Sequence, residues 1–219
     1  MSFSAAIFDL DGTLVDSLRD LADTANAVLA ESGFPQHPID AYRYFVGDGV
    51  QMLISRIVPE SASAYQRRSC LEMFTARYAA NWRINSCPYP GVHDMLLALK
   101  RLGLKMAVLS NKPHAFTEDF VGHFFPGQLF AAVFGQRQEV ERKPSPQAAF
   151  EIASLFGVAP KHCLFIGDTA IDMQTGSSAG MFTIGVLWGF RDRLELEQHH
   201  ADLIVEQPQE ITEYARRAR

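Results

Sequence analysis

The chain has 219 residues, of which 47% are hydrophobic and 21% charged, and its formal net charge is −5. This composition is ordinary for a globular protein with a core of its own. The negative balance argues against a general nucleic-acid binder, which would carry a basic face. Three cysteines without metal-ligand spacing indicate a reducing compartment. No apolar run reaches the length of a membrane span, and signal-peptide features are missing, so we expect a cytoplasmic protein.

Strand-like and helix-like segments alternate along most of the chain. The apolar run AAIFD (5–9) has strand length, and apolar residues take helical spacing from Leu18 to a stop at Gly33. Residues 35–85 show helical patterns without a convincing strand. CPYPGV (87–92) is a turn-rich break, and a helical stripe from Val92 to Gly103 follows it. The later strand-like runs are KMAVLS (105–110), AAVFG (131–135), CLFIGD (163–168), FTIGVL (182–187) and DLIV (202–205).

The continuous apolar character of these runs indicates a parallel sheet that is covered on both faces. We therefore predict an α/β fold, with a doubly wound, Rossmann-like core formed by residues 1–15 and 87–219. An all-helical cap domain is expected as an insertion at residues 16–86. Ligands of such sheets bind at the carboxyl ends of the strands, so the residues found there are the first functional candidates.

Polar and charged residues follow three of the predicted strands. They are Asp9 and Asp11, then Ser110 and Asn111, then Asp168 and Asp172. Lys143, in RKPSP, is expected at the start of a helix. Four carboxylates in one crevice would repel one another, and a hard divalent cation such as Mg²⁺ relieves that repulsion. Mg²⁺ also accepts a substrate phosphate oxygen, so the pattern predicts a small phosphorylated substrate.

Asp9 and Asp11 are two residues apart and share one face of an extended chain, whereas Leu10 points away. One carboxylate can attack phosphorus and form an aspartyl phosphate. The other can protonate the leaving oxygen and then deprotonate the attacking water. The groups expected around the phosphoryl group are Gly12, Ser110, Asn111 and Lys143.

FDLDGTLVDS, SNK, RKPSP and GDTAID resemble, in order and spacing, the four motifs of the haloacid dehalogenase superfamily. The resemblance implies that Asp9 is the nucleophile and Asp11 the general acid and base. It implies Mg²⁺ on Asp9, the backbone carbonyl of Asp11 and Asp168, with Asp172 and Thr13 supporting the metal site. It also implies that Ser110 and Lys143 hold the phosphoryl group.

The stretch FVGDGVQMLISR (45–56) resembles the cap of the phosphoglycolate phosphatase subfamily. Gly47 and Gly49 are either turn glycines or points where the cap backbone approaches substrate, and the pattern leaves both open. Arg56 is a candidate to neutralise a substrate carboxylate. The resemblance implies a phosphatase for a small metabolite, with 2-phosphoglycolate as the first candidate.

Several other functions share these motifs. A sugar-phosphate mutase would use the same aspartates, and the substrate could also be a sugar phosphate, a nucleotide or pyrophosphate. A non-catalytic binding protein is disfavoured because all the acidic site residues are present. A dehalogenase lacks the second aspartate, and a phosphonate-cleaving relative needs a cap lysine, which residues 16–85 do not contain. Neither nucleic acid nor membrane is expected as a partner, and the choice between monomer and homodimer stays open.

Overall fold

The computed structural model describes residues 2–218, and the chain clusters into two units. One unit comprises Met1–Val15 and Pro88–Arg219, and the other comprises Asp16–Cys87. We call them the sheet unit and the helical unit. No helix among residues 2–218 is both long and apolar enough to cross a membrane.

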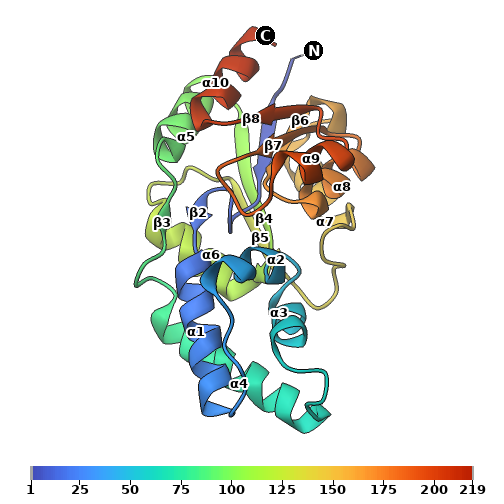
Figure 1. Ribbon diagram of the computed structural model, residues 1–219. Coiled ribbons are helices and arrows are strands. Elements are labelled where there is room, and N and C mark those ends of the chain that lie inside the picture. Colours follow the sequence, from blue (N-terminus) through green and yellow to red (C-terminus); the bar gives the residue numbers. More distant parts are fainter. Residues whose placement is uncertain (1, 219) are drawn as a thin grey trace. The chain divides into compact units, whose positions relative to one another are not determined.

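The sheet unit is built on six strands, and every neighbouring pair is parallel (Figure 1). In spatial order they are β5 (Ala132–Gln136), β4 (Lys105–Pro113), β1 (Ala5–Phe8), β6 (Cys163–Gly167), β7 (Phe182–Val186) and β8 (Leu203–Val205). The predicted doubly wound α/β core is thereby confirmed. The prediction that the strand beginning at Lys105 ends at Ser110 is wrong, because β4 continues through SNKP to Pro113. A register shift between Leu109 and Pro113 lets that polar segment stay paired with β5.

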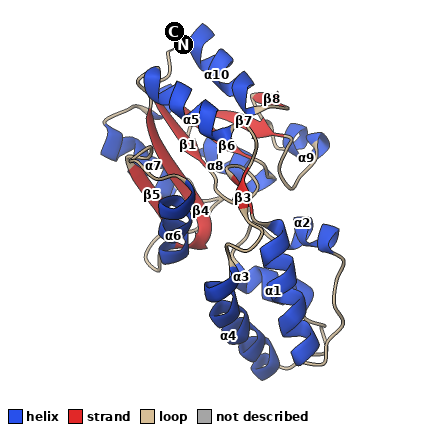
Figure 2. Ribbon diagram, turned by 90° about the vertical axis from the view of Figure 1, so that its left-hand side faces the viewer, coloured by secondary structure: helices blue, strands red, loops and turns tan. Residues whose placement is uncertain are grey.

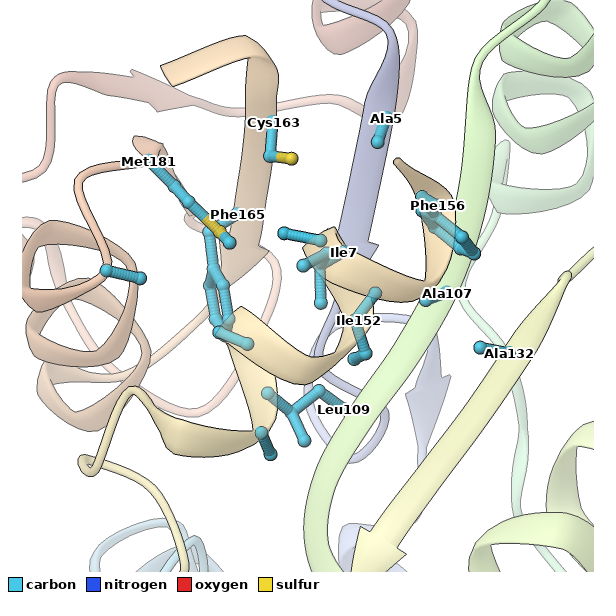
Figure 3. Packing of buried hydrophobic residues seen from close by; sticks show 14 residues of the cluster. Ala5, Ile7, Ala107, Leu109, Ala132, Ile152, Phe156, Cys163, Phe165 and Met181 are labelled. Carbon is cyan, nitrogen blue, oxygen red and sulfur yellow. The ribbon is translucent and has the colours of Figure 1, made fainter. Parts of the chain in front are cut away.

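Helices lie on both faces of this sheet (Figure 2). They are α5 (Val92–Arg101), α6 (His114–Phe124), α7 (Gln147–Phe156), α8 (Ala170–Ser178), α9 (Arg193–Gln198) and α10 (Pro208–Arg217). On one face, Ile152 and Phe156 of α7 belong to the same buried cluster as Ile7, Leu109 and Phe165 from three strands (Figure 3). This apolar packing fixes the strands whose ends carry the candidate residues.

The helical unit contains α1 (Leu18–Glu31), α2 (Tyr42–Phe45), α3 (Val50–Ile57) and α4 (Ala64–Asn81). No strand lies between residues 17 and 86, as predicted. A buried carboxylate ties the two ends of this unit together. Asp20 of α1 accepts hydrogen bonds from the backbone N–H groups of Asn85 and Ser86, at 2.9 and 2.8 Å, and from both side chains at 2.8 Å.

The chain passes between the units twice. It leaves the sheet unit through β2 (Val15–Asp16) and returns through β3 (Cys87–Pro88), and these two short strands are hydrogen-bonded neighbours.

Candidate active site

The carboxyl ends of β1, β4 and β6 meet because the three strands are in register. Phe8, the last residue of β1, is level with Val108 of β4 and Ile166 of β6. The N–H of Asp9 still donates to the carbonyl of Ile166 at 2.9 Å, so the first carboxylate follows directly from the sheet pairing. Asp168 leaves β6 at the same edge.

Three buried carboxylates converge at this edge. Oxygen atoms of Asp9, Asp168 and Asp172 lie within 4.8 Å of one another. The ammonium of Lys143 lies between two of them, 2.7 Å from Asp9 Oδ1 and 2.6 Å from Asp172 Oδ1. The Lys143 side chain is only 4% exposed. The structure thus brings Asp9 together with three residues that lie more than a hundred positions further along the chain.

Lys143 is held by a turn and not by a helix start, so that part of the prediction is wrong. It precedes α7, which begins at Gln147, and its position is fixed from β4. The Lys143 N–H donates to Asn111 Oδ1 at 2.9 Å, and Asn111 Nδ2 donates to the Lys143 carbonyl at 3.1 Å. The predicted phosphate donor Asn111 therefore orients the lysine backbone. Ser110 accepts from the N–H of Lys112 at 3.2 Å.

Burial dominates the electrostatics of these groups. It raises the pKa of Asp9 well above its usual value, and the nearby Lys143 ammonium offsets only part of that rise. Burial, followed by the neighbouring Asp172 carboxylate, raises the pKa of Asp168 to about 7. Burial disfavours the Lys143 ammonium, but Asp172 and Asp9 outweigh it and raise the pKa of Lys143 above its ordinary value. The cluster sets three buried carboxyl groups against the ammonium of Lys143, and their oxygen donors suit Mg²⁺.

Two loops hold Asp168. Its Oδ1 accepts from Thr13 Oγ1 at 3.1 Å, and its Oδ2 accepts from the N–H of Phe190 at 2.8 Å. Gly12 and Gly189 press against it, since an added Cβ would lie 2.3 Å from an Asp168 atom at either position. Trp188 Nε1 donates to the Thr13 carbonyl at 2.9 Å and joins the two loops.

The segment Trp188–Phe190 was missed by the sequence analysis. The available signal was its place directly after a predicted strand, but it carries no charged side chain at 188–190. The segment contributes the backbone N–H of Phe190 and the indole N–H of Trp188, and neither belongs to a pattern of charged residues.

Asp172 is fixed at the start of α8. Its Oδ2 accepts from the N–H of Thr169 at 3.1 Å and from Thr169 Oγ1 at 2.7 Å, which closes a capping box. Gly167 makes room for this carboxylate, since a Cβ there would lie 2.2 Å from the Asp172 Cβ.

Asp11 is not a member of this group of three carboxylates and has a different partner. Lys112 Nζ donates to both of its oxygens, at 2.9 and 3.1 Å. Lys112 was also missed, although it is the third residue of SNK. The sequence predicts that the strand ends before Lys112, where a lysine is usually solvated, but Lys112 lies within β4 and its side chain is 6% exposed.

The three cap candidates belong to the helical unit. Gly47 and Gly49 both have positive φ, at 112° and 85°, and Gly49 is the N-cap residue that precedes α3. Arg56 donates to the Asp48 carboxylate and, at 3.0 Å, to the Phe45 carbonyl. Positive φ favours glycine at both positions.

Comparison with known proteins assigns the chain to a family. A family model described as haloacid dehalogenase-like hydrolase matches residues 6–186. The chain belongs to that family. Phosphoglycolate phosphatase from Mannheimia succiniciproducens is 34% identical over 206 residues, which cover 91% of this chain and 92% of the relative. The Pseudomonas putida protein of the same name is 32% identical, over 91% of this chain and 75% of its own.

A solved structure from Lactobacillus delbrueckii subsp. bulgaricus, whose phosphoglycolate phosphatase name is itself provisional, superposes with a TM-score of 0.93 at 31% identity. The match covers 98% of this chain and 99% of that one. The resemblance that the motifs suggest is therefore confirmed at the level of the family.

Proposed function

We propose that this protein hydrolyses a small phosphomonoester and that 2-phosphoglycolate is its first substrate. The observation that carries the proposal is the buried Asp9 carboxylate, held 2.7 Å from Lys143 beside two further carboxylates at the ends of parallel strands. The names of the relatives support the choice of substrate.

Asp9 is the proposed nucleophile. Its carboxylate attacks phosphorus, the bond from phosphorus to the leaving oxygen breaks, and an aspartyl phosphate forms. Lys143 and Asn111 keep Asp9 in place, the first through its ammonium and the second through the lysine backbone. Asp9, Asp168 and the backbone carbonyl of Asp11 would hold Mg²⁺, which supplies positive charge for phosphoryl oxygens when it is bound.

Asp11 is the proposed acid and base. It gives a proton to the leaving oxygen and then takes one from water, which attacks phosphorus and releases phosphate and the free Asp9 carboxylate. Asp11 suits this work because it is separate from the carboxylate cluster and its side chain is 18% exposed. Ser110 and the backbone at Gly12 lie at the same strand ends and are the proposed contacts to the phosphoryl group.

The test is phosphate release from a panel of phosphomonoesters, with and without Mg²⁺. The panel contains 2-phosphoglycolate, sugar phosphates, nucleoside monophosphates and pyrophosphate. We expect Mg²⁺-dependent release and at least a tenfold preference for 2-phosphoglycolate, about 1.4 kcal/mol of transition-state binding. Broad, unselective release would remove the substrate assignment. Isomerisation of glucose 1-phosphate without phosphate release would replace the hydrolase with a mutase.

A further inference from the structure

Trp188 joins two loops of the proposed metal site by a side-chain hydrogen bond. It follows β7, which ends at Val186, and its indole Nε1 donates to the Thr13 carbonyl in the loop after β1, at 2.9 Å. The tryptophan is half-buried and Thr13 is 1% exposed, so the bond is largely shielded from water. A shielded donor and acceptor are costly to separate, and the bond therefore keeps the two loops together.

The loop after β1 closes on itself, so the bond from the indole fixes more than one residue. The N–H groups of Leu14 and Val15 both donate to the Leu10 carbonyl, at 2.9 and 3.0 Å. Thr13 lies within this turn. Asp11, whose backbone carbonyl is a proposed ligand of Mg²⁺, lies in the same turn, so its position depends on the contact at the Thr13 carbonyl.

The segment that carries Trp188 also holds a second proposed ligand. The N–H of Phe190 donates to Asp168 Oδ2 at 2.8 Å, and Thr13 Oγ1 donates to Asp168 Oδ1 at 3.1 Å. Trp188, Thr13 and Asp168 thus belong to a closed ring of contacts that Phe190 completes. The indole bond is the hydrogen bond in this ring that ties the segment 188–190 to the turn after β1.

We infer that Trp188 is a positioning residue that tunes the site to Mg²⁺ relative to Ca²⁺, because it fixes the turn of Asp11 against Asp168. The inference deepens the proposed function and rests on its assignment of these two ligands. Mg²⁺ requires nearly octahedral oxygen ligands at about 2.0–2.1 Å, whereas Ca²⁺ accepts a variable geometry at about 2.3–2.6 Å. Loosening the turn therefore weakens the binding of Mg²⁺ more than that of Ca²⁺.

A charged pair next to this segment supports a different part of the site. Arg191 Nε lies 3.2 Å from Glu195 Oε2, and Glu195 Oε1 accepts from the N–H of Ala170 at 3.0 Å. This pair contacts the first residue of α8, the helix that carries Asp172. Trp188, in contrast, contacts the turn after β1.

The experiment measures the dissociation constants of Mg²⁺ and Ca²⁺ by calorimetry in the wild type, Trp188→Phe and Trp82→Phe. Trp188→Phe keeps an aromatic ring and removes the N–H donor. Trp82, the other tryptophan of the chain, belongs to the helical unit and is the matched control. A general loss of stability would weaken the binding of both ions alike, so the ratio of the two constants isolates the positioning effect.

We expect the dissociation constant of Mg²⁺ to rise about tenfold or more in Trp188→Phe, as is typical when a group that orients a metal ligand is removed. That of Ca²⁺ should rise less than about threefold, because its coordination is more tolerant. Trp82→Phe should leave both constants unchanged. Equal changes for the two ions in Trp188→Phe, or no change, overturn the inference, and so does the same shift of the ratio in Trp82→Phe.

This measurement separates the inference from the proposed hydrolysis, because it needs no turnover. A shift of the ratio in Trp188→Phe supports the inference even if the wild type releases no phosphate. An unchanged ratio overturns it even if hydrolysis is fast, and so does a wild type that binds neither ion. Trp188→Met, which also lacks the donor, replaces the phenylalanine variant if that protein does not fold.

Discussion

At the scale of single residues, the site works through a short chain of opposite charges. Lys143 links Asp9 to Asp172, and Asp172 is in turn fixed by Thr169 at the start of α8. Each link is buried, so each charge depends on its neighbour. The orientation of Asp9 therefore depends on the turn that holds Lys143 and on the start of α8.

The first prediction concerns the nucleophile. Asp9→Asn should abolish phosphate release, because the amide cannot attack phosphorus, and activity should fall by at least about 10⁴-fold, as is common when a nucleophile is removed. Phosphate release with 2-phosphoglycolate and Mg²⁺ measures the loss, and circular dichroism checks that the fold is retained. Appreciable turnover in this variant would exclude Asp9 as the nucleophile.

The second prediction concerns Gly189. A Cβ there would lie 2.3 Å from the Asp168 Cβ and 2.4 Å from the Gly12 carbonyl oxygen, so Gly189→Ala must displace Asp168. We expect at least tenfold weaker Mg²⁺ binding by calorimetry, the range seen when groups supporting a metal ligand are changed. Gly122→Ala, where nothing lies within 4 Å, is the matched control and should bind Mg²⁺ normally. Unchanged binding in Gly189→Ala would mean that the loop does not position Asp168.

At the scale of elements, the parallel strands account for most of what the sequence reveals. Continuous apolar runs predict the strands, and the residues that end them predict the carboxylates. The polar end of β4 was missed because backbone pairing continues where hydrophobicity stops. The turn at Lys143 was missed for a related reason, since Asn111, far away in sequence, sets its backbone. Local patterns do not contain such long-range backbone contacts.

The third prediction concerns the contact between α1 and residues 85–86. The Asp20 carboxylate accepts hydrogen bonds from four donor groups, and an amide has only one oxygen to accept them. We therefore expect Asp20→Asn to lower the free energy of unfolding by about 1–3 kcal/mol. Urea unfolding measures the loss. Asp23→Asn is the control. Asp23 pairs with Arg19 on the surface of the same helix, where such a pair contributes about 0.3–0.5 kcal/mol.

The same contact should respond to pH. Burial alone would raise the pKa of Asp20, but the hydrogen bonds from Asn85 and Ser86 outweigh it and lower the pKa below its ordinary value. The carboxylate therefore stabilises the fold above the unfolded pKa of about 3.9, and this contribution is lost as the pH falls through the lower folded value. Unfolding curves between pH 3 and 6 should converge for the wild type and Asp20→Asn at the acid end. A constant difference would contradict this.

At the scale of the whole molecule, the sheet unit gathers three buried carboxyl groups around the ammonium of Lys143. The wild type should therefore gain thermal stability from Mg²⁺, by about 2.7 kcal/mol at a hundred times the dissociation constant. Because the pKa of Asp168 is raised to about 7, protons compete with the cation, and the gain should be smaller at pH 6 than at pH 8. Thermal unfolding with Mg²⁺ or EDTA tests this. Asp168→Asn should show little gain, and a full gain there would place the cation elsewhere.

The pairing of β2 with β3 has a consequence for how such proteins diversify. The chain leaves the sheet unit at Val15–Asp16 and returns at Cys87–Pro88. Because these two strands are hydrogen-bonded neighbours, residues 17–86 form an insertion whose two ends lie side by side. Replacing this insertion by the corresponding segment of a relative need not change the order of the strands in the sheet. Chimeras joined at these two places can therefore exchange residues 17–86 while keeping the strands of the sheet unit, which makes this junction a natural point for joining segments from two parents.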